Sequence, residues 1–136
     1  MPFSLALYLW VALGSALGGA ARFLCTGVAA RLFGETFPWG TLFVNVLGSL
    51  TIGFFATLTG PDGRIFAGTT ARQFVMTGIL GGFTTFSSFS LQTLALLQDG
   101  EWLLASANIA LSVIACLLAV WAGYALAASI NALKWI

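Results

Sequence analysis

Charged side chains are widely spaced along this chain, and the apolar runs between them predict four helices that cross a membrane. In order, the charges are Arg22, Arg31, Glu35, Asp62, Arg64, Arg72, Asp99, Glu101 and Lys134. Four uncharged stretches of 21 or more residues result, and about 20 residues are enough to span a hydrocarbon core of about 30 Å. We therefore place membrane helices near residues 4–32, 38–60, 71–98 and 102–130.

The connections between these helices are short and carry turn residues. Gly and Pro occur in 34–38, Gly, Pro and Asp in 59–63, and Asp99-Gly100-Glu101 forms the last link. Short links of this kind predict antiparallel neighbours. No Lys or Arg precedes Arg22, so the first helix lacks the basic start of a signal peptide and we expect it to be retained. We predict one domain, residues 1–136, in the all-α membrane class.

Composition agrees with a membrane protein and limits the chemistry. The 136 residues are 60% hydrophobic and only 7% charged, with no histidine, whereas soluble domains average about 25% charged. All four carboxylates fall in or beside predicted loops, so no helix contains an ordinary proton carrier. Acid/base pairs, metal-ligand clusters and a Ser/His/Asp arrangement are also missing, so we do not expect an enzyme. Cys25 and Cys116 are expected to be unpaired apolar thiols.

The charges flanking the helices give almost no orientation signal. With both termini on one side, Arg64, Arg72 and Lys134 lie opposite Arg22 and Arg31. A bias of three against two is nearly none under the positive-inside rule. The chain could insert both ways up and pair as an antiparallel, dual-topology homodimer about an axis in the membrane plane. A single fixed orientation is the alternative.

Residues 81–90, Gly-Gly-Phe-Thr-Thr-Phe-Ser-Ser-Phe-Ser, place glycines and hydroxyls at the midpoint of the third helix. Polar groups at that depth are costly unless they line a cavity or a protein interface. Gly81-Gly82 followed by Thr84-Thr85 predicts that the helix breaks at its midpoint. A broken helix offers carbonyl ligands to a cation and N–H donors to an anion.

Other polar positions in the helices repeat every four residues. Thr41, Asn45 and Ser49 share one face of the second helix, and Asn108 and Ser112 share one face of the fourth. These residues either hold helices together or line an ion path.

Small and aromatic residues also follow helical spacing. Gly14 with Gly18, and Gly78 with Gly82, predict close helix packing. Phe83, Phe86 and Phe89 recur every third residue, and such rings either fill the core or turn their positive edges toward an anion. Arg22, near the end of the first helix, either reaches the membrane surface or draws anions into a vestibule.

These motifs together closely resemble the Fluc (CrcB) fluoride channels. The resemblance rests on residues 81–90, on Pro38 to Asn45 with Gly48 and Gly53 behind it, and on Gly18-Gly19-Ala20-Ala21-Arg22-Phe23. It implies a dual-topology homodimer in the bacterial inner membrane that exports fluoride passively through two antiparallel pores. It also implies a structural sodium ion at the dimer centre.

The resemblance assigns roles to individual residues. Carbonyls of Gly81 and Thr84 would hold the sodium ion, while the fluoride pathway would contain Asn45, Phe86, Phe89, Thr41, Ser88, Ser112 and, near its vestibule, Arg22. Three positions depart from the family pattern: Gln92 replaces a common glutamate, Asn108 a tyrosine or histidine, and Ser88 a threonine.

Two other functions compete with a fluoride channel. A small multidrug-type, proton-coupled antiporter also has four short helices, but it needs a glutamate in the first helix, and this one has none. A non-conducting membrane assembly subunit would use the glycines and asparagines only for packing.

Overall fold

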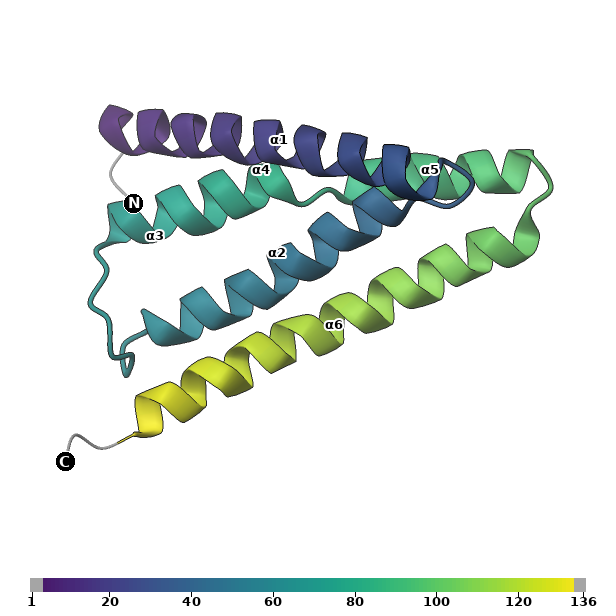
Figure 1. Cartoon of the computed structure of the whole chain (residues 1–136). Helices are drawn as coiled ribbons and strands as arrows, with labels where there is room; N and C mark the ends of the chain where they lie inside the picture. The colour runs from purple at the N-terminus through teal and green to yellow at the C-terminus, as the bar shows by residue number, and fades with distance from the viewer. Residues whose placement is uncertain (1–3, 134–136) are drawn as a thin grey trace.

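The computed structural model describes residues 4–133 as helices joined by short loops (Figure 1). Four helical segments are long and apolar enough to cross a membrane: Leu5–Phe33, Trp39–Leu58, Thr69–Gln98 and Trp102–Ala132. The predicted all-α membrane class and the four spans are therefore confirmed. Each observed boundary lies within two residues of the predicted one.

The first two spans and the last are single helices, whereas the third contains several elements. The single helices are α1 (Leu5–Phe33), α2 (Trp39–Leu58) and α6 (Trp102–Ala132). The third span consists of α3 (Thr69–Gln73), the π-helix η1 (Phe74–Leu80), α4 (Gly81–Phe83) and α5 (Phe86–Gln98). Consecutive spans run in opposite directions (Figure 1). The turns after α1 and α5 contain Gly34 and Gly100, both at φ 77°, a backbone region that favours glycine.

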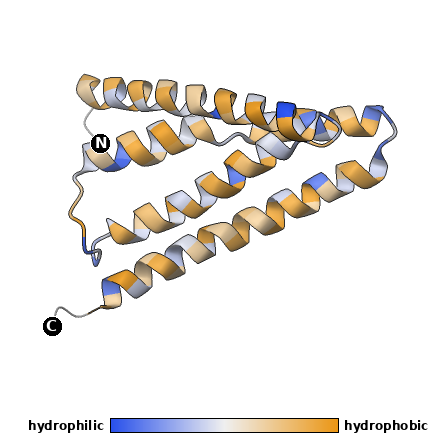
Figure 2. Ribbon diagram, in the orientation of Figure 1, coloured by the Kyte–Doolittle hydropathy of each residue, from blue (hydrophilic) through white to orange (hydrophobic). Residues whose placement is uncertain are grey.

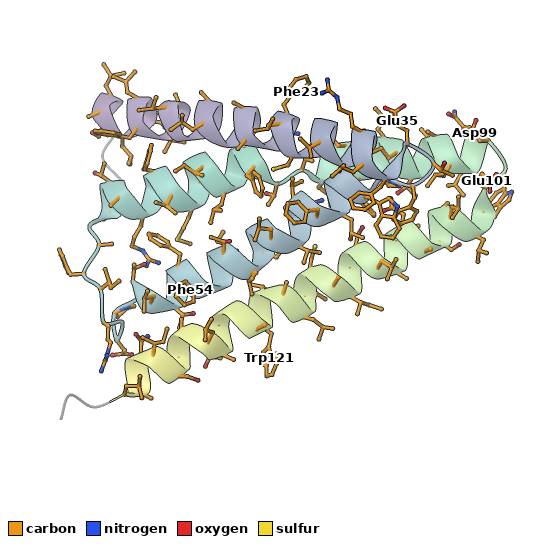
Figure 3. All side chains as sticks on the ribbon, viewed as in Figure 1. Phe23, Glu35, Phe54, Asp99, Glu101 and Trp121 are labelled. Atoms are coloured by element: carbon orange, nitrogen blue, oxygen red, sulfur yellow. The ribbon has the colours of Figure 1, made fainter. Side chains whose placement is uncertain are left out.

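Hydrophilic residues concentrate in the loops, and the spans are mainly apolar (Figure 2). Glu35, Asp99 and Glu101 lie together at one end of the bundle (Figure 3). Arg31, near the end of α1, is at that same end. Asp62, Arg64 and Arg72 belong to the opposite end, in the α2–α3 loop and in α3. Lys134 lies outside the described residues.

Glycines bring the helices into close contact, as their spacing predicts. A Cβ atom on Gly18 would lie 2.0 Å from the carbonyl oxygen of Ile79 in η1, and one on Gly82 would lie 2.6 Å from that of Ser15. A Cβ atom on Gly123 in α6 would likewise approach the carbonyl of Leu50 in α2 to 2.1 Å. No side chain fits at such distances, so α1 with the first half of the third span, and α2 with α6, form two closely packed pairs.

Much of the apolar surface faces outward. Phe23 is 84% exposed and Leu103 is 82% exposed, and Trp121 on α6 points away from the bundle (Figure 3). Soluble monomers rarely expose so many large apolar side chains, whereas lipid covers them in a membrane.

Candidate functional site

The helical backbone of the third span is interrupted by two extended residues. Thr84 has φ −87° and ψ 158°, and Thr85 has φ −155° and ψ 115°. Helix α4 ends immediately before these residues and α5 begins immediately after them. Non-helical backbone at membrane depth is tolerated where protein or water satisfies its polar groups. The groups that do so here come mainly from α2 and from Thr85 itself.

Asn45 on α2 binds both backbone groups of Thr85. Its Nδ2 donates to the Thr85 carbonyl oxygen at 3.0 Å, and its Oδ1 accepts from the Thr85 N–H at 2.7 Å. The Asn45 side chain therefore stands in for a neighbouring peptide group at the interruption. Asn45 thus joins α2 to the third span. Its second Nδ2 hydrogen is not used in these two bonds.

The side chain of Thr85 caps the helix that follows. Its Oγ1 accepts from the N–H of Ser88 at 3.1 Å and is 3.2 Å from the Ser87 hydroxyl. Thr85 is only 8% exposed. A threonine at this N-cap position satisfies a backbone donor that the first turn of a helix otherwise leaves without a partner.

A cavity of about 430 Å³ opens beside the interruption. Six of the nine residues predicted for the fluoride pathway or the sodium site line it: Asn45, Gly81, Thr84, Phe86, Phe89 and Ser112. Its wall contains amide, hydroxyl and backbone groups together with apolar side chains, but no charged side chain. The surface is suited to a small ion that exchanges water for neutral hydrogen-bonding groups.

Phe86 and Phe89 form an aromatic pair in the wall of this cavity. Their ring centroids are 5.2 Å apart and their planes are inclined at 48°. Phe89 is 8% exposed and Phe86 is 76% exposed. One ring is thus fixed in the subunit, while the other lies at its surface.

Ser112 connects the cavity to a buried polar network. Its hydroxyl is 3.4 Å from Oδ1 of Asn108, and Nδ2 of Asn108 donates to Thr93 Oγ1 at 2.9 Å. Asn108 is 1% exposed. The amide of Asn108 therefore lies behind the cavity wall and joins α6 to α5.

The remaining predicted residues lie outside this cavity. Thr41 lines a second hollow, of about 600 Å³, together with Gln92, Glu35, Asp99 and Glu101. Ser88 lines neither cavity and instead bonds with Thr85. Arg22 also lines neither, and its Nε is buried without a hydrogen-bond partner among the described residues.

Comparison with known proteins assigns the chain to a family. Residues 9–124 match the model of the CrcB-like protein family, described as Camphor Resistance (CrcB). The chain belongs to the CrcB family. A member from Opitutus terrae is 61% identical over 130 residues, covering 96% of this chain and 98% of that protein. A member from Methylocella silvestris is 61% identical over 127 residues, covering 93% of this chain and 97% of that protein. Each carries the name fluoride-specific ion channel FluC.

Thr85 of this CrcB protein was predicted only as part of the helix break and was assigned to neither the fluoride pathway nor the sodium site, yet it makes several hydrogen bonds there. It exchanges two hydrogen bonds with Asn45 and caps α5 with its hydroxyl. The adjacent threonines at 84 and 85 signalled a helix break, but nothing in the sequence separates the role of one from that of the other.

Proposed function

We propose that this protein is a fluoride-selective channel that lets fluoride leave the cell passively. The observation that carries the proposal is its similarity, at 61% identity over nearly the whole length, to proteins named fluoride-specific ion channels. The cavity chemistry agrees with this activity. Fluoride is small and strongly hydrated, so a path for it needs closely spaced neutral donors that replace water.

In the proposed mechanism, fluoride sheds its water onto protein donors and ring edges. Asn45 and Ser112 offer an amide and a hydroxyl inside the mid-span cavity, and Thr41 and Ser88 extend the path. Phe86 and Phe89 present the positive edges of their rings, which attract an anion without trapping it. Arg22 attracts fluoride toward the vestibule. A narrow bore with closely placed donors excludes chloride and larger anions.

The proposed assembly is an antiparallel, dual-topology homodimer in the bacterial inner membrane, with two antiparallel pores. Two observations support it. The charge bias that would orient a single copy is nearly absent, and the cavity wall includes Gly81 and Phe86, both at the subunit surface. Because an antiparallel pair superimposes only the middle of each span, surface residues at the interruption would meet their counterparts there.

We further propose a structural sodium ion at the dimer centre, held by the carbonyl oxygens of Gly81 and Thr84 from each subunit. When bound, the ion would neutralise these carbonyl dipoles and fix the two interruptions against each other. The residues present fit a hard cation, because in an uninterrupted helix the carbonyls of Gly81 and Thr84 would accept from the N–H groups of Thr85 and Ser88. Those two N–H groups donate to side chains instead.

The function is tested with purified protein in liposomes loaded with either fluoride or chloride, with efflux followed by ion-selective electrodes. We expect rapid fluoride loss and little chloride loss. Equal loss of both anions would contradict selectivity, and retention of fluoride would favour a non-conducting assembly subunit. Fluoride loss that required a proton gradient would favour coupled transport. The four carboxylates, which all lie outside the helices, argue against that coupling.

The arrangement of the two copies is tested in cells. A single cysteine replaces an exposed loop residue such as Phe66, which is 97% exposed, in a background that lacks Cys25 and Cys116. A membrane-impermeant thiol reagent is then applied from outside. Labelling of about half the chains supports dual topology, and labelling of all or none indicates one orientation.

A further inference from the structure

At the interruption in the third span, two backbone N–H groups do not make their usual helical hydrogen bonds. A helix interrupted at two residues normally regains its lost hydrogen bonds nearby, because bare carbonyls are costly in an apolar span. Here two specific N–H groups, those of Thr85 and Ser88, are diverted from the helical pattern. Their acceptors are side-chain oxygens of Asn45 and Thr85, two residues that are not among the predicted cation ligands.

The first diversion depends on Asn45. Its Oδ1 accepts the Thr85 N–H at 2.7 Å, so this N–H no longer serves the carbonyl of Gly81, four residues earlier. The opposite bond, from Nδ2 to the Thr85 carbonyl at 3.0 Å, fixes the plane of the amide. Two antiparallel bonds to one residue leave the peptide of Thr85 little freedom to rotate back toward Gly81.

The second diversion depends on the Thr85 side chain. Its Oγ1 accepts the Ser88 N–H at 3.1 Å, so this N–H no longer serves the carbonyl of Thr84. The Thr84 side chain is also fixed, because its hydroxyl donates to the Leu80 carbonyl at 2.9 Å. Each predicted sodium ligand has therefore lost its helical donor to one identifiable side chain.

From this pattern we infer that Asn45 and Thr85 are positioning residues for the cation site. They divert the two amide hydrogens that would otherwise occupy the carbonyls of Gly81 and Thr84, and so keep both oxygens available to a sodium ion. The inference rests on the proposed sodium site and goes beyond it, since neither Asn45 nor the Thr85 side chain touches the ion. It also couples the two ions, because Asn45 lines the cavity proposed for fluoride.

A matched pair of variants tests the role of the Thr85 hydroxyl. Thr85→Val removes the acceptor of the Ser88 N–H but keeps the shape of the side chain, whereas Thr85→Ser keeps the acceptor. Sodium binding is measured on the purified chain in detergent with radioactive sodium. The rise in unfolding temperature, as sodium chloride replaces choline chloride, is measured in parallel.

We expect Thr85→Val to weaken sodium binding by about tenfold, the effect of about one hydrogen bond, and Thr85→Ser to stay within about threefold of wild type. Raising the sodium concentration should restore fluoride efflux in Thr85→Val. Equal sodium affinities of the wild type and Thr85→Val would overturn the inference. Failure of the wild type to bind sodium would instead overturn the sodium site itself.

A measurement on the wild type needs no variant and remains available if Thr85→Val does not fold. Hydrogen exchange of the Thr85 and Ser88 amides is compared in sodium chloride and in choline chloride. We expect both amides to be protected in both salts, because their acceptors are side chains and not the carbonyls offered to the ion. Rapid, unprotected exchange of either amide would overturn the inference.

Discussion

Asn45 and Thr85 exchange two hydrogen bonds in opposite directions, although 40 residues separate them in sequence. The amide of Asn45 thereby replaces a missing helical neighbour at the point where α4 ends and α5 begins. One side chain joins α2 to the interruption in the third span and also lines the mid-span cavity. Under the proposed function, Asn45 would therefore affect stability, cation binding and anion passage together.

Asn45→Leu should destabilise the protein by about 1–3 kcal/mol, because it leaves a backbone N–H and a carbonyl of Thr85 without these partners in an apolar environment. The unfolding free energy in detergent measures the effect. Thr51→Val is the matched control on the same helix, because the Thr51 hydroxyl bonds only within α2, to the Leu47 carbonyl. If both variants lose equal free energy of unfolding, the hydrogen bonds between Asn45 and Thr85 do not stabilise the fold more than a bond within α2.

Gly48→Ala should displace the interruption and abolish most fluoride efflux. A Cβ atom on Gly48 would lie 2.2 Å from Cγ2 of Thr84, and the hydroxyl of Thr84 is held by the Leu80 carbonyl. Thr84→Ser removes only the obstructing methyl group, so the double variant Gly48→Ala/Thr84→Ser should recover efflux. If the double variant does not recover efflux, contact with the Thr84 methyl group is not the cause of the loss.

Gly18→Ala should separate α1 from the third span. Its Cβ would approach the backbone carbonyl of Ile79 to 2.0 Å, whereas a Cβ on Gly19 meets nothing within 4 Å. We expect Gly18→Ala to lower the unfolding temperature by several degrees, corresponding to about 1–3 kcal/mol, and Gly19→Ala to leave it unchanged or slightly raised. Thermal unfolding in detergent compares the two, and an equal response would contradict the close contact.

Phe86→Ile should slow fluoride efflux by at least about tenfold, because it removes the ring edge but keeps an apolar side chain in the cavity wall. Phe43→Ile is the control, since Phe43 is 53% exposed on α2 and does not line the cavity. Electrode recordings from liposomes measure efflux, and size-exclusion chromatography checks the assembly. Normal efflux in Phe86→Ile would remove this ring from the pathway.

The sequence predicts the four spans well, because charge spacing and helix length are local properties. The close contacts of Gly18 and Gly82 were also predicted, since small residues repeated every four positions form one face of a helix. The sequence could not predict which residue each polar side chain would contact. Periodicity puts Thr41, Asn45 and Ser49 on one face of α2, but only the tertiary arrangement brings Asn45 to Thr85 and leaves Thr41 in the second hollow.

The sequence also could not predict which hydroxyl of Thr84 and Thr85 would donate a hydrogen bond and which would accept one from the backbone. Thr84 and Thr85 are identical residues side by side, yet the hydroxyl of Thr84 donates backward to Leu80 while that of Thr85 accepts from Ser88, further along the chain. The difference follows from the end of one helix and the start of the next falling between them. The π-helical turn of η1, at Phe74–Leu80, also has no distinctive composition, although such turns are frequent at functional sites.

The charges at the two ends of the bundle have an electrical consequence. One end carries Arg31 against Glu35, Asp99 and Glu101, and the other carries Arg64 and Arg72 against Asp62. Each subunit is thus an electric dipole along its long axis, and its energy in the membrane voltage depends on which way up it is inserted. In the proposed inverted pair the two dipoles cancel, so the membrane voltage favours neither orientation of the assembled protein.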